Sequence, residues 1–282
     1  SNAADFKTHA ESADPAVITV TGTLDLAAVG GAIQVKSNKT IQGFDQNATI
    51  RGKLDLGSGG VNNVLIRGLT ITNPGTTIVE GQYTDGGPGI SLRGATNVFI
   101  THCTVYDCAG ALIDIGQGSD NITVSWCEFY YTSASLLNRH VMLAGLDGAE
   151  TKPLHITLHH NLWHDNADQR MPSGSFGYVH LYNNYWNTPG NTSASNARDQ
   201  AQFFSEHNVY HQVQSPLYKQ NIDTALPGGL IRALGNVYTE TTGEAADAGS
   251  DTVFTPDYSY QMLAAADVPT IVLAGAGNTA GA

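Results

Sequence analysis

The stretch Asn63-Val64-Leu65-Ile66-Arg67-Gly68-Leu69-Thr70-Ile71 decides the fold, because its pattern returns along the chain. An Asn opens a short run of alternating apolar residues, a bend follows, and a second short run comes after the bend. Alternation with a period of two is typical of β-strands that bury one face. Further copies occupy residues 97–105, 121–129, 155–163 and 178–186, and two looser copies end at residues 208–210 and 236–238.

The spacing of these copies indicates how the strands are arranged. With Leu69 as the reference, successive equivalent positions are 34, 24, 34, 23, 24 and 28 residues apart. A basic step of about 23 residues, lengthened by loops in some copies, is the mark of a solenoid. A β-sandwich also contains short strands, but it does not explain a repeated strand–bend–strand phrase. We therefore predict an all-β, single-stranded right-handed parallel β-helix with loop insertions, with strands from about Ile18 to Val237.

One position of the repeat carries polar residues that we expect to stack. Side-chain amides at a bend can form hydrogen bonds to the next coil, so a ladder is predicted here. Its members are Asn161, Asn184, Asn208 and Asn236. Cys103 and Cys127 hold the same position in earlier copies. A disulfide between them is one interpretation, and two thiols stacked in the core are the favoured one; the three cysteines match no zinc spacing.

The two ends of the chain differ from the repeat. Residues 1–3, Ser-Asn-Ala, look like the remnant of a cleaved tag, and residues 4–282 are predicted to form a single β-helix domain. After about Gly243 the repeat stops. We expect the remaining stretch to form a flap over the stack, with a short helical turn at residues 261–267 and a frayed Gly-Ala tail.

Charge and hydropathy exclude two classes of partner. The net charge of −12 argues against nucleic acid, whose phosphates require a basic footprint. No run of about 18 apolar residues is present, so no membrane-spanning helix is predicted. An acidic protein also needs a local basic cleft or a bound cation to accept a polyanion.

Several short phrases follow one another at residues 37–43, 63–67, 112–115, 123–126, 159–161 and 169–172. In this order they resemble the pectate lyase and pectin lyase superfamily of polysaccharide lyases, and the resemblance runs from about Ile18 to Ala276. It implies β-elimination on a galacturonan chain. A base removes the proton at C5 of a uronate and the C4–O glycosidic bond breaks, which requires stabilisation of the developing enolate charge. Calcium-dependent members hold Ca²⁺ against the substrate carboxylate, whereas pectin lyases act on methyl esters without it.

The resemblance assigns the catalytic role to Arg170, in the phrase Gln169-Arg170-Met171-Pro172. A free guanidinium is a poor base, because its pKa lies above about 12. Arg170 therefore needs a depressed pKa or acts mainly on the enolate. The family usually carries further basic residues just after the proline. Ser173 and Ser175 stand at those positions here.

The calcium ligands that the family uses are incomplete in this chain. Asp114 matches the last acidic ligand, but Gly110 and Pro88 stand where two others are usual. Because Ca²⁺ takes six to eight oxygens, one carboxylate does not hold it. Asp85 and Asp107 lie nearby in the sequence and are candidate replacements. Each can also be a solvated loop acid, which is the favoured interpretation for Asp107.

A basic residue that binds the substrate carboxylate in the family aligns with His140, and Arg139 is adjacent. Other histidines, at His102, His159 and His160, are interpreted as structural. Trp126, Trp163 and Trp186 either stack on sugars or pack in the solenoid, and the shared repeat position of the last two favours packing.

Taken together, these residues predict a secreted, monomeric polysaccharide lyase that cleaves pectic homogalacturonan by β-elimination at Arg170, with Ca²⁺ as cofactor. Its partner is an acidic plant-type polysaccharide, with neither nucleic acid nor membrane. Two alternatives stay open. One is a metal-free pectin lyase on methyl-esterified pectin, and the other is a non-catalytic pectin-binding β-helix.

Overall fold

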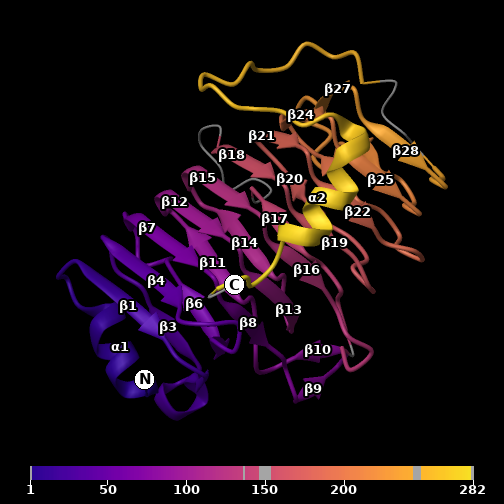
Figure 1. The fold of residues 1–282 in the computed structure, drawn as a ribbon. Coiled ribbons are helices and arrows are strands. Elements are labelled where there is room, and N and C mark those ends of the chain that lie inside the picture. The colour runs from indigo at the N-terminus through magenta and orange to yellow at the C-terminus, as the bar shows by residue number, and fades with distance from the viewer. Residues whose placement is uncertain (1, 136, 146–153, 244–248, 281–282) are drawn as a thin grey trace.

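The computed structural model describes residues 2–135, 137–145, 154–243 and 249–280. Its strands form three parallel sheets that share one core (Figure 1). The predicted right-handed parallel β-helix is confirmed, and its strands run from Ala16 to Thr239.

Each of the first eight coils contributes one strand to each sheet, in the order A, B, C, and the last coil contributes an A strand and a B strand among the described residues. Sheet A contains β1 (Ala16–Val20), β4 (Lys39–Gly43), β7 (Asn62–Arg67), β12 (Thr96–Thr101), β15 (Asp120–Ser125), β18 (Leu154–His159), β21 (Gly177–Tyr182), β24 (Gln202–Glu206) and β27 (Leu230–Leu234). Sheet B contains β2 (Thr23–Asp25), β5 (Thr49–Arg51), β8 (Thr70–Asn73), β13 (Thr104–Cys108), β16 (Glu128–Tyr130), β19 (Leu162–Trp163), β22 (Tyr185–Asn187), β25 (Val209–His211) and β28 (Val237–Thr239). Sheet C contains β3 (Ala32–Gln34), β6 (Lys53–Asp55), β11 (Ile90–Arg93), β14 (Ile113–Gly116), β17 (Met142–Ala144), β20 (Ser173–Gly174), β23 (Ser195–Ala197) and β26 (Leu217–Lys219). A small antiparallel hairpin, β9 (Ile78–Val79) and β10 (Gln82–Tyr83), lies outside these sheets.

The register stacks like side chains on one another along the axis. In sheet A one inward file runs through Val64, Val98, Ile122, Ile156 and Val179, all of them buried. Each such apolar side chain contributes roughly 1.5–3 kcal/mol on burial. Repetition of one inward position in coil after coil is therefore enough to specify the stack.

The interior also holds an aromatic file. Trp163 and Trp186 stack with ring centroids 4.3 Å apart, and the stack continues to Tyr210 at 4.4 Å. Both tryptophans are fully buried. The packing interpretation is thus confirmed for these two residues.

The corner between sheets A and B is a tight bend of constant length. From β7 to β28, two residues separate each A strand from the following B strand. The first of the two adopts positive φ in every coil, for example +51° at His102 and +52° at Trp126. The second carries the predicted ladder position.

The Asn ladder is present at this corner. Asn161 Oδ1 accepts a hydrogen bond from Cys127 N at 2.9 Å, while its Nδ2 donates to Val124 O at 2.9 Å and to Asn184 Oδ1 at 3.0 Å. Asn184 repeats the pattern with Asn208. The chain turns at this bend, so strand pairing does not supply partners for its buried backbone amides. The ladder supplies those hydrogen bonds instead.

Cys103 and Cys127 occupy the ladder position in the two coils before Asn161. Cys103 and Cys127 are free, fully buried thiols, as the favoured interpretation expected. Burial raises the pKa of Cys127 well above its ordinary value, and the neighbouring Cys103 raises it further. The Cys127 thiol is therefore not available as a thiolate at neutral pH.

Replacing Asn184 with alanine is expected to lower the free energy of unfolding by about 3 kcal/mol, because Asn161 N and Leu158 O lose buried partners. Urea unfolding followed by circular dichroism measures the loss. The exposed Asn47→Ala variant serves as the control. Equal stability of the two variants would show that the ladder contributes nothing.

The N-terminal end of the core is covered by α1 (Ala3–Glu11) (Figure 1). This helix buries Phe6 and Ala10 against the first coil, and Asn2 Oδ1 accepts from Asp5 N at 2.9 Å as its N-cap. Helix α1 was not predicted. The assignment of residues 1–3 as a tag remnant stays a prediction.

The C-terminal segment runs back along the stack from its last coils. Residues 254–263, here called the strap, lie on the outer face of sheet A, and the helices η3 (Ala265–Asp267) and α2 (Val268–Gly275) follow. Helix α2 packs Val268 and Val272 against Leu162, Tyr185 and Val209 of sheet B. The predicted flap is present, but its helix begins at Ala265 and not at residue 261. Among the described residues, no helix is long and apolar enough to cross a membrane.

The Gly-Ala tail does not fray within the described residues. Asn278 N donates to Thr104 Oγ1 at 2.9 Å, and Asn278 Nδ2 donates to Thr70 Oγ1 at 3.2 Å. Gly277 N donates to Trp126 O. The expectation of a frayed tail was wrong up to residue 280, because backbone and amide hydrogen bonds join the tail to the A–B corner.

Candidate active site

Arg170 lies on the connection from β19 to β20, at the corner between sheets B and C. Its φ is +59°, which is unusual for a residue with a side chain. Neighbouring coils hold the backbone on both sides: Met142 N donates to Arg170 O at 2.6 Å, and Ser195 Oγ donates to Met171 O at 2.7 Å. Met171 is fully buried and Arg170 is half-buried. The buried neighbour thus anchors an arginine whose side chain reaches the surface.

His140 lies beside Arg170 on the preceding coil. A parallel bridge pairs His140 with Gln169, which places it next to the arginine. Burial lowers the pKa of His140, and the positive charge of Arg170 lowers it further. His140 is therefore a neutral imidazole at neutral pH, able to donate or accept one hydrogen bond but carrying no charge.

Arg139 borders a cleft next to this pair. Its Nη1 donates to Asn166 Oδ1 at 3.3 Å, and its carbonyl accepts from Asp168 N at 3.0 Å. The cleft has a volume of about 390 Å³ and includes His140 in its wall. The structure thus brings together three of the residues predicted from the sequence, Arg139, His140 and Arg170.

The acidic residues predicted to bind metal have other partners. Asp85 accepts from Thr76 N at 2.9 Å and from Thr77 N at 2.7 Å, which closes its own loop. Asp107 accepts from Thr132 N at 2.8 Å. Asp114 points outward from β14, next to Ser91 in register.

Asp114 has a cationic side chain against it. Arg93 Nε donates to Asp114 Oδ2 at 3.0 Å, and the Arg93 Nη2 donates to the same oxygen. The other oxygen, Oδ1, is buried and has no hydrogen-bond partner in the part of the chain that the structure describes. Within the described ranges, no group of three or more His, Cys, Asp or Glu side chains can hold a metal ion. One carboxylate neutralised by a guanidinium does not fit Ca²⁺, which takes several charged oxygen ligands.

Arg93 was missed by the reasoning from sequence. The repeat contained the information needed to find it. Strands β11 and β14 belong to adjacent coils, and Arg93 pairs with Gly116, two residues beyond Asp114. Residues two apart share a face of a strand, so an aligned repeat would have placed Arg93 beside Asp114.

His102, Trp126, His159 and His160 lie at the A–B corner, on a different corner of the coil from Arg170. Burial lowers the pKa of His159 to about 3, and neighbouring histidines contribute to this shift. Burial likewise lowers the pKa of His160 to about 4. These imidazoles are neutral and take no part in the Arg170 site.

The chain thus combines a right-handed parallel β-helix with an arginine and a neutral histidine beside a cleft on its side. The family model described as pectate lyase matches residues 1–280. The chain belongs to the pectate lyase family and is a polysaccharide lyase.

Relatives and solved structures agree with this assignment. Pectate lyase A of Emericella nidulans is 29% identical over 99% of this chain and 80% of its own length. A probable pectin lyase F-2 of Aspergillus terreus is 31% identical over 92% of this chain and 55% of its own length. A crystal structure of a pectate lyase from Bacillus sp. N165 in complex with trigalacturonate superposes with a TM-score of 0.78 at 25% identity, covering 98% of this chain and 91% of that one.

Proposed function

We propose that this protein cleaves homogalacturonan by β-elimination, with Arg170 as the residue that takes the C5 proton. The C5–H electron pair forms the C4=C5 double bond, the C4–O bond breaks, and the leaving oxygen takes up a proton. The observation that carries the proposal is Arg170 itself, clamped at positive φ and half-buried next to Gln169 and His140, which line the cleft. The name of the Emericella relative and the trigalacturonate bound to the Bacillus enzyme support the substrate class.

The neighbours of Arg170 have distinct proposed roles. Arg139 binds a uronate carboxylate, because a guanidinium is a planar donor that matches a carboxylate. His140 donates a neutral hydrogen bond to the sugar chain, because burial and the charge of Arg170 lower its pKa. Arg170 becomes a cation when it takes the C5 proton, and because His140 adds no charge, this guanidinium is then the main positive charge against the enolate.

Mixing the protein with polygalacturonate and with highly methylated pectin tests the proposal. Ultraviolet absorbance of the unsaturated uronide product is the readout. Faster cleavage of polygalacturonate is expected. Preference for the methyl ester would instead favour a pectin lyase, and binding without product on either polymer would indicate the non-catalytic alternative.

The role proposed for calcium differs from the role that the sequence predicted. The family is generally Ca²⁺-dependent, but Asp85, Asp107 and Asp114 do not form a site that fits the ion among the described residues. We propose that the guanidinium of Arg93 supplies the fixed positive charge beside Asp114 and that catalysis proceeds without added metal.

Chelation with EDTA is therefore expected to change the rate of polygalacturonate cleavage by less than about twofold. The positive charge beside Asp114 belongs to a side chain of the protein and not to a metal ion that a chelator can remove. Replacing Arg93 with alanine removes this positive charge. It leaves the Asp114 carboxylate, with a side chain only 8% exposed, without its counter-charge. The melting temperature of this variant should fall and should recover in part with millimolar Ca²⁺.

Lys219→Ala is the control for the Arg93 variant, since Lys219 pairs with Asp251 through a side chain that is 45% exposed. Its melting temperature should change little, with or without Ca²⁺. A wild-type enzyme that EDTA inactivates and Ca²⁺ restores would contradict the role given to Arg93.

We also propose that the protein acts outside the cell as a monomer. Its substrate class is a wall polysaccharide too large to enter a cell intact. Activity in the culture medium and a sedimentation coefficient of a single chain are the expected results.

A further inference from the structure

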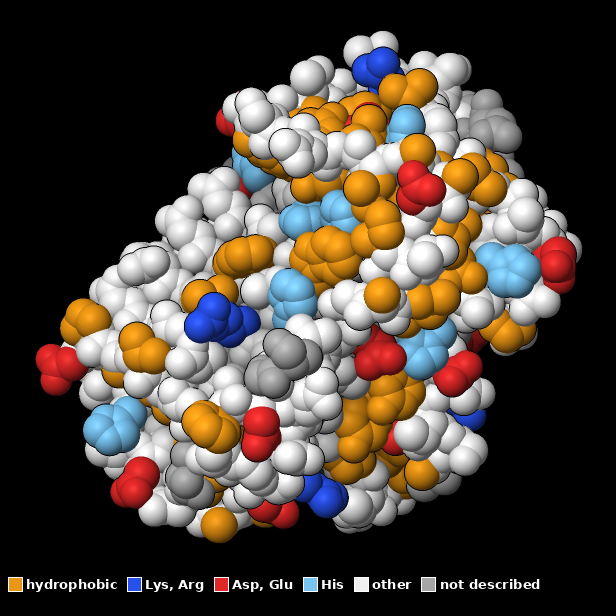
Figure 2. All heavy atoms as spheres, in the orientation of Figure 1, with side chains coloured by type: hydrophobic (Ala, Val, Ile, Leu, Met, Phe, Trp, Pro, Cys, Tyr) orange, Lys and Arg blue, Asp and Glu red, His pale blue; other side chains and the backbone are white. Residues whose placement is uncertain are grey.

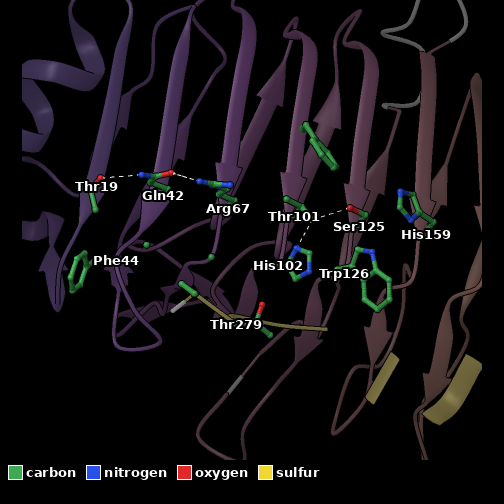
Figure 3. Close-up of a pocket in the computed structure, with 14 residues that line it drawn as sticks. Thr19, Gln42, Phe44, Arg67, Thr101, His102, Ser125, Trp126, His159 and Thr279 are labelled. Carbon is green, nitrogen blue, oxygen red and sulfur yellow. Dashed lines mark hydrogen bonds between the residues drawn. The ribbon is translucent and has the colours of Figure 1, made fainter. Parts of the chain in front are cut away.

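A second groove lies at the A–B corner, away from Arg170. It has a volume of about 770 Å³, and we call it the edge groove. Six consecutive strands of sheet A each contribute one polar residue near their carboxyl end: Thr19, Gln42, Arg67, Thr101, Ser125 and His159 (Figure 3). Because neighbouring strands lie roughly 4.8 Å apart, the groove extends about 24 Å along the axis. A groove of this length fits an extended chain better than a compact small molecule.

Aromatic side chains lie beside this polar row in the lining of the edge groove. Phe44 is 64% exposed and Phe99 is 41% exposed, both high values for phenylalanine. His102 stacks on Trp126 with ring centroids 5.9 Å apart, and Trp126 stacks on His160 at 4.5 Å. Because His102 and His160 cover the faces of Trp126, the flat apolar surfaces open to the C–H faces of a sugar chain are those of Phe44 and Phe99. The row of hydroxyl and amide groups beside them offers partners for the sugar hydroxyls.

The charge of the edge groove opposes that of the molecule as a whole. The chain carries a net charge of −12, yet the described lining includes Arg67 and no Asp or Glu. Arg67 Nη2 and Nε donate to Gln42 Oε1 at 2.7 and 3.1 Å, and Gln42 Nε2 donates to Thr19 Oγ1 at 3.2 Å. A neutral amide thus orients the guanidinium without neutralising it. Figure 2 shows a basic side chain among apolar and histidine side chains on this face.

We propose that the edge groove binds a second stretch of an acidic uronan chain, with Arg67 on a carboxylate and with the ring of Phe99 and the edge of Trp126 against the sugar rings. The choice of a uronan rests on the proposed function. Arg170 and Arg67 lie on different corners of the coil, so one molecule holds two stretches of polymer at once. The edge groove then keeps the enzyme on its substrate between cuts and raises the local concentration of polymer at Arg170.

Two residues of the C-terminal tail complete the edge groove. Thr279 and Ala280 line it, and the bonds from Asn278 to Thr70 and Thr104 fix the tail in place. The wall that the tail forms is therefore part of the folded structure, and the groove is preformed. A preformed groove binds without the entropy cost of ordering a loop.

Calorimetric titration with hexagalacturonate tests the inference. The full chain carries Arg170→Ala to prevent cleavage. Two molecules of hexagalacturonate per chain are expected. Adding Arg67→Ala should weaken the second site by roughly tenfold, because it removes a charge-assisted hydrogen bond. Adding Arg51→Ala, which removes an equal charge from an exposed position outside the groove, should leave both sites unchanged.

Tryptophan fluorescence provides a second readout for the edge groove. Of the three tryptophans, Trp163 and Trp186 are fully buried, whereas Trp126 lines the groove. Ligand binding should change the emission of Trp126, and Trp126→Phe should abolish the part of the signal that Arg67→Ala weakens. Phe99→Ala should weaken the same phase. In wild-type Arg170 protein, Arg67→Ala should leave cleavage of trigalacturonate unchanged and slow cleavage of the long polymer.

Each other result has a definite meaning. One binding site per chain, unaffected by Arg67→Ala, would overturn the inference. So would dimers in sedimentation that Arg67→Ala dissociates, because the edge groove would then hold a second copy of the chain. If the wild type cleaves the polymer but has a single binding site per chain, only this inference is wrong. Two sites without cleavage in the wild type would sink only the proposed function.

Discussion

Replacing Arg170 with alanine is expected to lower kcat/KM on polygalacturonate by about 10³-fold, because the variant loses both the proton acceptor and the charge facing the enolate. The loss should appear in kcat more than in KM, since the interaction is strongest in the transition state. Initial rates from the absorbance of the unsaturated product measure both parameters. The melting temperature should stay close to that of the wild type, because buried Met171 and its hydrogen bonds hold the loop.

Two variants sharpen this result. Arg170→Lys keeps a positive charge but loses the planar fork, so an intermediate loss of activity is expected. Arg51→Ala removes an exposed arginine at the end of β5, four coils away from Arg170 along the stack, and should be fully active. If Arg170→Ala keeps more than about a tenth of the wild-type kcat, Arg170 does not take the C5 proton.

The second large effect concerns stability and the attachment of the strap. His180 Nε2 and Glu206 Oε1 lie 2.8 Å apart, and their side chains are 1% and 3% exposed. Tyr258 OH lies 2.7 Å from His180 Nδ1, and Tyr260 OH donates to Glu206 Oε1 at 2.5 Å. His180→Ala leaves the Glu206 carboxylate buried without its main partner. A loss of about 3–5 kcal/mol in the free energy of unfolding is expected.

Chemical denaturation of His180→Ala measures this loss, and limited proteolysis within the strap reports whether it detaches. The matched control is His155→Ala, because His155 lies 2.8 Å from Asp120 with a side chain that is 56% exposed. That exposed pair should contribute less than about 1 kcal/mol. Similar losses in the two variants would show that burial of the His180–Glu206 pair has no special effect.

The same network predicts acid sensitivity. Burial opposes ionisation of Glu206, but hydrogen bonds from His180 and Tyr260 outweigh it and hold the pKa of Glu206 below its usual value. A lowered folded-state pKa contributes stability above the unfolded pKa, and this contribution disappears as the pH falls through the folded value. The wild type should therefore lose stability below about pH 4.5, the ordinary pKa of glutamate, and Glu206→Gln should lose less over the same range.

The fold was predictable from sequence because a solenoid repeats one local rule. The strand–bend–strand phrase fixes which residues face inward, and each coil contacts only its neighbours. The Asn ladder followed from the same alignment. Helix α1 and the position of α2 were not predicted, because each occurs once and no repeat supports it. Pro269 near the start of α2 is a helix-start signal that could have placed it correctly.

The site was predictable only in part, for a related reason. Arg170 and His140 meet because their coils are adjacent and the backbone pairs there. The carboxylates depended on loops whose paths the sequence does not reveal. Asp85 and Asp107 satisfy threonine donors in their own surroundings, and Arg93 supplies the charge that a metal was expected to supply. Side chains that meet across coils are found only after the register is known.

The constant two-residue bend at the A–B corner has a consequence for how this protein can change over evolutionary time. From β7 onward, differences in coil length fall in the other connections; four residues separate β13 from the next C strand, and sixteen residues separate β8 from the next one. The corner that carries the Asn ladder can therefore serve as an unchanging spine. Mutation can lengthen, shorten or recruit loops around Arg170 without altering the spine, so new substrate preferences can arise while the folding code of the chain stays intact.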